Sequence, residues 1–158
     1  MEENFEDSVS RVRNYLNESK LPIELVSISK TTATAVQAAQ TLGVEVDQIG
    51  KSIVVGNSDL LIIVLLRGTA RVSVEKLSTL AGQTVKLLDK SEVFKRTGFK
   101  VGGVSPIGSL EKARVFMDSE LFNFETVWVA GGSPYSVFGC SPEILKNLTQ
   151  AEICDVTI

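Results

Sequence analysis

The sequence predicts an α/β protein of the α+β type. We expect a single mixed, strongly curved, barrel-like β-sheet of about six or seven strands, with short helices packed outside it. Apolar and β-branched runs follow one another too often for a regular alternation of strands and helices. Short amphipathic stretches with capping residues separate some of these runs. The 158 residues are 44% apolar and show no linker or repeat, so we expect one domain over residues 1–158.

Two helices are predicted in the N-terminal part. Between residues 5 and 16, apolar residues recur at spacings of four, three and four, which is the pattern of an amphipathic helix that ends before Pro22. Thr34 and Gln37 have the spacing of a capping box, in which a hydroxyl is followed three residues later by an amide. A second helix is therefore expected over residues 35–42.

The centre of the chain predicts a β-hairpin. Two apolar runs, residues 51–55 and 60–66, flank a polar segment of turn-forming residues at 56–59. The second run is the longest apolar run of the chain and suits a buried strand. We therefore expect a hairpin with a turn of about four residues.

The remaining elements follow from the same signals. Ser141 followed by Pro142 has the form of a helix cap with proline at the first helical position. In chain order we expect a strand over 23–28, a helix over 73–82, a strand over 85–88, helical turns over 91–97, a loop over 101–108, strands over 114–117 and 126–130, a turn over 131–134, a helix over 142–148 and a closing strand over 151–158.

The composition excludes several kinds of catalytic site. The chain has no histidine, which removes Ser-His-Asp and Cys-His mechanisms and histidine-ligated metals. Cys140 and Cys154 are too few for a disulfide framework, and we expect two free, buried thiols. Because no base is available to activate it, Cys140 is not a candidate nucleophile.

Charge and hydropathy restrict the partners. The net charge is −3, whereas proteins that bind DNA or long RNA helices usually carry a basic excess. We therefore expect no DNA binding, and any contact with RNA to involve a short end. The acidic start of the chain and the lack of an apolar run of about 18 residues predict a cytoplasmic protein with no membrane contact.

Several short motifs together resemble one known family. Lys51 opens an apolar strand, and a Gly-x-x-x-Pro loop runs from Gly102 to Pro106. With these motifs in this order, the chain resembles the YbaK/ProX family of aminoacyl-tRNA editing domains over about residues 34–145. The segments that carry the resemblance are residues 34–39, 42–44, 48–54, 76–77, 97–99, 102–108, 117–121 and 129–132.

The resemblance implies a barrel-like mixed sheet and hydrolysis of mischarged tRNA. The expected activity is that of a trans-acting aminoacyl-tRNA deacylase, with tRNA-Pro carrying Cys, Ala or another small amino acid as substrate. The implied partners are the 3′ end of an aminoacyl-tRNA and, as a further candidate, prolyl-tRNA synthetase. No metal and no cofactor is implied.

Lys51, Gly102 and Gly103 are the expected catalytic residues. The resemblance places the lysine and the glycine loop in one pocket. A lysine ammonium is a compact positive partner for an ester carbonyl or a phosphate. Glycines let backbone N–H groups approach a ligand closely, and such groups could hold the oxyanion that forms when the ester is attacked. Because no pair of nucleophile and base is visible, the attacking group is water or a group of the substrate.

The expected substrate-binding residues each have a structural alternative. Thr34 could simply cap its helix, and Asp118 could cap the turn over residues 119–121. The glycine pair after the strand at 126–130 could simply form a turn. The full expected set is Thr34, Val104, Ser105, Pro106, Asp118, Gly131 and Gly132.

A second function class stays open on the sequence alone. The same pocket could belong to a non-catalytic module that binds an aminoacyl-tRNA end or an aminoacyl-adenylate-like ligand. Such a module would bind without turnover, so an assay for amino-acid release distinguishes the two.

Overall fold

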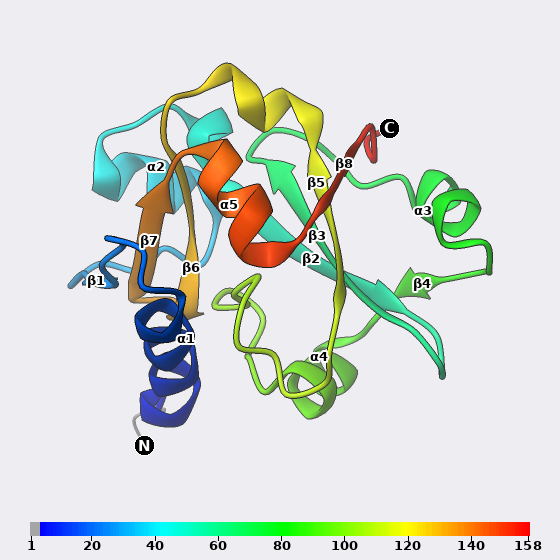
Figure 1. Cartoon of the computed structure of the whole chain (residues 1–158), viewed down its shortest axis with the longest axis horizontal. Coiled ribbons are helices and arrows are strands. Elements are labelled where there is room, and N and C mark those ends of the chain that lie inside the picture. The colour runs from blue at the N-terminus through cyan, green and yellow to red at the C-terminus, as the bar shows by residue number, and fades with distance from the viewer. Residues whose placement is uncertain (1–3) are drawn as a thin grey trace.

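A computed structural model describes residues 4–158, and its strands form two separate sheets (Figure 1). The larger sheet has the strand order β4-β2-β3-β5-β8 and the smaller one the order β1-β7-β6. In chain order the elements are α1 (Glu6–Ser19), β1 (Val26–Ser27), α2 (Ala35–Leu42), the 3₁₀ helix η1 (Val46–Gln48), β2 (Gly50–Gly56), β3 (Leu61–Arg67), α3 (Val74–Ala81), β4 (Lys86–Leu87), α4 (Lys90–Thr97), β5 (Arg114–Asp118), the 3₁₀ helix η2 (Ser119–Asn123), β6 (Val127–Ser133), β7 (Ser136–Cys140), α5 (Pro142–Thr149) and β8 (Glu152–Cys154).

The expectation of one strongly curved, barrel-like sheet is wrong. In the described part of the chain the fold is a mixed α+β fold with five α-helices and two sheets, and neither sheet closes. To close the sheet, β2 would have to pair with β6 along its length. Instead β2 pairs with β4 at Val55 and Gly56, and Ile49, just before the strand, makes an isolated bridge to Trp128 of β6. The edge of β2 between these two points is left open.

The predicted hairpin forms the centre of the larger sheet. β2 and β3 pair in full register from Gly50↔Arg67 to Gly56↔Leu61. Residues 61–66 of β3 are almost completely buried because apolar clusters cover both faces of the sheet. On its other edge β3 pairs in parallel with β5, and β5 pairs in parallel with β8. This rigid hairpin holds the first half of β2 in a fixed position.

The smaller sheet differs from the expectation in one informative place. The turn predicted at residues 131–134 is instead the end of β6, which continues to Ser133 before it turns into β7, a strand that was not predicted. The pairing of β6 with β7 is irregular between Ala130 and Ser133. Gly132, with φ +102, passes so close to Ser8 of α1 that a side chain would clash with it. The glycines therefore allow a bulge under a helix.

Strand lengths at the two ends of the chain are also shorter than expected. The strand expected over residues 23–28 is reduced to Val26–Ser27, and the closing strand to Glu152–Cys154. The capping box of Thr34 and Gln37 and the cap at Ser141 are confirmed. No helix in residues 4–158 is long and apolar enough to cross a membrane.

Candidate functional site

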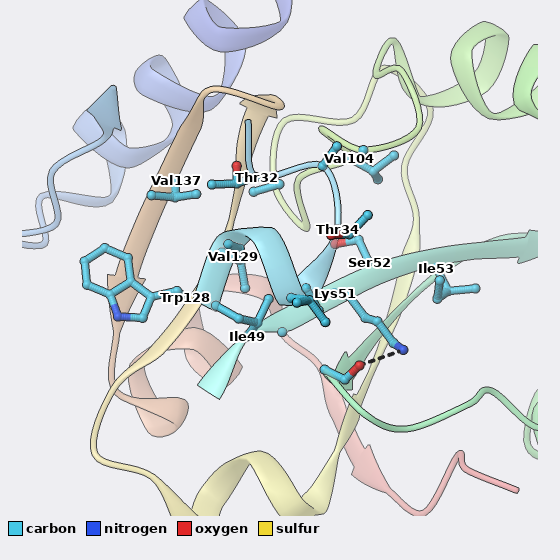
Figure 2. Close-up of a pocket in the computed structure, with 18 of the residues that line it drawn as sticks. Thr32, Thr34, Ile49, Lys51, Ser52, Ile53, Val104, Trp128, Val129 and Val137 are labelled. Atoms are coloured by element: carbon cyan, nitrogen blue, oxygen red, sulfur yellow. Dashed lines mark hydrogen bonds between the residues drawn. The ribbon is translucent and has the colours of Figure 1, made fainter. Parts of the chain in front are cut away.

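A cavity of about 400 Å³ lies at the open edge of β2 (Figure 2). One wall is the first half of β2, the opposite wall is β6 from Trp128 to Ala130, and α2 covers the space between them. The rest of the lining comes from Val101, Gly102 and Val104 of the loop before β5, from residues 32–34, and from Gly68 and Val137. The cavity therefore occupies the place where pairing of β2 with β6 would have closed the sheet.

Lys51 enters this cavity from β2. Its Nζ donates a hydrogen bond of 3.1 Å to the carbonyl oxygen of Gly68, and both residues line the cavity (Figure 2). The side chain is only partly buried. The Lys51 ammonium thus has one acceptor from the protein and still lies beside the cavity, where a ligand can reach it.

The segment that carries Gly68 is held tightly against η1. A side chain at Gly68 would clash with the carbonyl oxygen of Val46. The next residue, Thr69, donates from both its backbone N–H and its hydroxyl to Asp47 Oδ1, at 2.9 and 2.6 Å. These contacts fix the carbonyl that receives the Lys51 ammonium.

The surroundings of Lys51 disfavour its charged form. Burial lowers the pKa of Lys51 below the ordinary 10.5, the positive charge of Arg71 lowers it further, and the negative charge of Asp47 raises it in part. A desolvated ammonium that faces a like charge is well suited to receive an anion or a developing negative charge.

Removal of the like charge is expected to raise the pKa of Lys51. In Arg71→Ala, the ammonium loses a repulsive neighbour, so its pKa should move up towards 10.5. The pKa is measured by NMR titration of the lysine side-chain ¹³Cε resonance. Arg71→Lys, which keeps the charge, is the matched control and should leave the titration near that of the wild-type protein. An identical titration in Arg71→Ala would show that Arg71 does not act on Lys51.

The glycine loop lies beside Lys51. Gly102 and Val104 line the same cavity as Lys51, and Gly102 has φ +97, a conformation that favours glycine. The N–H of Gly103 donates to the Lys100 carbonyl oxygen at 2.9 Å, and a side chain at Gly103 would clash with the backbone of Ser133. Gly102 and Val104 therefore face the cavity, whereas Gly103 shapes the turn that presents them.

The other predicted residues fall into two groups. Thr34 lines the cavity and caps α2 at the same time. Ser105 and Pro106, which end the loop, are buried and do not line the cavity. Gly131 and Gly132 are buried under Leu25 and α1, respectively.

Asp118 also lies outside the cavity lining. Its Oδ2 accepts from the backbone N–H of Arg67 at 3.1 Å and from Arg67 Nη1 at 2.9 Å. Its Oδ1 accepts from the Glu120 N–H and so caps η2. Through these hydrogen bonds Asp118 connects the end of β3 to the end of β5.

The cysteines do not supply a nucleophile. Cys140 is buried, and burial raises its pKa to about 11, so its thiol is protonated near neutral pH. Cys154 is half-buried rather than buried, and its pKa is also raised, mainly by burial. Within residues 4–158 no group of three or more His, Cys, Asp or Glu side chains is arranged to hold a metal ion.

Most residues of the cavity lining were not predicted as site residues, and four of them matter for its geometry. Ile49 and Trp128 form the bridge between the sheets, and Gly68 and Ser52 stand on either side of Lys51. An isoleucine, a tryptophan and a serine in strands look like ordinary sheet residues. Gly68 could have been noticed because it interrupts a polar segment directly after a buried strand.

Comparison with known proteins gives a consistent result. A family model described as "Aminoacyl-tRNA editing domain" matches residues 29–148. "Uncharacterized protein YwhH" of Bacillus subtilis (strain 168) is 29% identical over 147 residues, which cover 92% of this chain and 94% of that protein. "Putative Cys-tRNA(Pro)/Cys-tRNA(Cys) deacylase EbsC" of Enterococcus faecalis is 26% identical over 131 residues, or 82% of this chain and 80% of that one.

A solved structure agrees over nearly the whole chain. It is described as "Crystal structure of a putative trans-editing enzyme for prolyl tRNA synthetase". The TM-score is 0.90 at 32% sequence identity, and the match covers 98% of this chain and 99% of the other.

Proposed function

This chain belongs to the aminoacyl-tRNA editing domain family, and from that premise we propose that it is a trans-acting deacylase of mischarged tRNA. The bond hydrolysed is the ester between a small amino acid, such as cysteine or alanine, and the 3′ end of tRNA-Pro. The names of EbsC and of the prolyl-tRNA trans-editing structure support this substrate class. They also support prolyl-tRNA synthetase as the protein that supplies the mischarged tRNA.

One observation carries the proposal: Lys51 and the Gly102 loop line the same small cavity. The Lys51 ammonium lies where it can hold the terminal phosphate or polarise the ester carbonyl. The backbone N–H groups of Gly102 and Val104 are the donors proposed for the oxyanion, with Gly103 holding their turn in shape. Water, or a group of the substrate, attacks the carbonyl. Because an aminoacyl ester is already activated, positioning and charge can supply much of the acceleration.

The cavity also suggests how the amino acid is selected. Its wall at Ile49, Trp128 and Val129 is apolar, and its volume of about 400 Å³ must hold both the aminoacyl group and part of the terminal ribose. One methylene in an apolar pocket changes binding by only about 1–3 kcal/mol. We therefore expect graded rather than absolute preference among alanine, serine and cysteine.

The test is release of free amino acid from charged tRNA-Pro. Purified protein is incubated with tRNA-Pro carrying alanine, serine, cysteine or proline, and release is compared with spontaneous hydrolysis. We expect at least one small non-cognate amino acid to be released catalytically and proline to be retained. Tight binding of charged tRNA without release would instead identify the protein as a binding module.

A further inference from the structure

The open edge of β2 leaves the backbone polar groups of Ser52 without a partner strand beside the cavity. In an antiparallel pair, the N–H and C=O of a residue point to the same edge, and the edge alternates from one residue to the next. The Val54 carbonyl oxygen accepts from Leu88 N–H at 3.2 Å, so Val54 faces the edge occupied by β4. Ser52, two residues earlier, faces the same edge at a point that β4 does not reach. Its backbone N–H and C=O have no partner strand there.

The side chain of Ser52 is unpaired as well. Within residues 4–158, Ser52 Oγ is the one buried side-chain nitrogen or oxygen that has no hydrogen-bond partner. A buried hydroxyl without a partner is unfavourable, and native proteins rarely keep one without a reason. Ser52 lines the cavity, so rotation about its Cα–Cβ bond can bring Oγ towards a ligand. The backbone and the hydroxyl together form a polar spot in a mostly apolar wall.

The charges of the lining determine what this spot can bind. An aminoacyl ester brings an α-ammonium into the cavity, yet among the described lining residues there is no aspartate or glutamate. The Lys51 ammonium would repel it. Because successive residues of a strand point to opposite faces, Lys51 and Ser52 are directed apart. Figure 2 shows the Lys51 side chain extending towards the Gly68 carbonyl, to which it donates its hydrogen bond.

We propose that Ser52 holds the α-ammonium of the aminoacyl group, through its hydroxyl and its backbone carbonyl at the open edge of β2. The inference rests on the proposed deacylase function and names the residue that orients its substrate. The amine end of the aminoacyl group is thereby held at the open edge of β2, and its ester carbonyl extends from there towards Lys51 and the backbone N–H groups of Gly102 and Val104. Ser52 would thus recognise the α-ammonium, which is common to all amino acids, while the amino-acid side chain contacts the apolar wall of the cavity.

The experiment compares substrates with and without the α-amine. tRNA-Pro is charged with the amino acid that the wild-type protein releases fastest, and separately with the matching deaminated acid, which for alanine is propionate. The measured quantity is the ratio of kcat/KM for the two esters, after subtraction of spontaneous hydrolysis. Ser52→Ala is expected to lower this ratio about tenfold by slowing only the ester that has an amine. Ser52→Thr keeps the hydroxyl, so its ratio of kcat/KM values should stay close to that of the wild-type protein.

Stability and a second serine provide the controls. Because Ser52→Ala removes an unpaired buried hydroxyl, its Tm should equal or exceed that of the wild-type protein. Ser27→Ala, at an exposed position of β1, should leave kcat/KM for both esters unchanged. A Ser52→Ala protein that slows both esters equally, or neither, would overturn the role of Ser52. If the wild-type protein releases neither acid, the proposed function itself fails.

Discussion

Lys51→Ala is expected to lower kcat/KM for release of the amino acid from charged tRNA-Pro by about 100- to 1,000-fold. This is the usual loss when one preorganised group that stabilises developing charge is removed. Lys51 is the lysine whose ammonium lines the cavity beside Gly102, and its hydrogen bond to Gly68 fixes its direction. Steady-state kinetics with the fastest amino acid measures the effect.

Folding should survive this change. The fold disfavours the charged form of Lys51, as its lowered pKa shows, so loss of the ammonium should leave Tm within a few degrees of the wild-type value. Lys51→Met keeps the apolar stem and removes only the charge, and it should be as inactive as Lys51→Ala. Lys86→Ala, on exposed β4, is the matched control and should be fully active. Wild-type rates in both Lys51 variants would remove the ammonium from the mechanism.

Gly68→Ala is expected to lower kcat/KM by about tenfold or more, although the residue contributes no side chain to the site. The added methyl group would clash with the Val46 carbonyl oxygen, so the segment that includes Thr69 must move away from η1. The carbonyl that positions the Lys51 ammonium would move with it. A displacement of about 1 Å can cost roughly a hundredfold in rate. Gly68 is thus a positioning residue.

The control for this variant is a glycine far from the cavity. Gly82, with φ +72, ends α3 in open space, so Gly82→Ala adds backbone strain of about 1 kcal/mol without a clash. Both variants should lose stability in thermal unfolding, but only Gly68→Ala should lose activity. Loss of the Gly68 acceptor should also lower the pKa of Lys51 further, because a carbonyl stabilises the ammonium that donates to it. Equal activity of the two variants would show that Gly68 does not position Lys51 for catalysis.

Local signals in the sequence were sufficient for the hairpin, the helix caps and the family. Apolar runs around a polar turn specify β2 and β3 without reference to the rest of the chain, and Thr34 with Gln37 specifies a helix start. The family resemblance is confirmed by the match over residues 29–148. Its motifs are short and local, which is why Lys51 and Gly102 could be proposed together and are found to line one cavity.

The closure of the sheet could not be derived in this way. Whether β2 pairs with β6 depends on segments about 80 residues apart, and no local pattern states that Ile49 and Trp128 make a single bridge. Asp118 is a similar case, because its partner Arg67 is 51 positions away. The open edge that results is also what gives Ser52 its unpaired groups, so a serine that looks ordinary in the sequence becomes a candidate only in the fold.

The most direct test is a crystal structure with a non-hydrolysable 3′-aminoacyl-adenosine analogue, in which an amide replaces the ester. We expect the aminoacyl group in the cavity between β2 and β6. Its carbonyl should lie within about 3 Å of a backbone N–H of Gly102 or Val104, with the Lys51 ammonium beside it. An analogue that is well ordered elsewhere on the protein, with this cavity empty, would contradict the account.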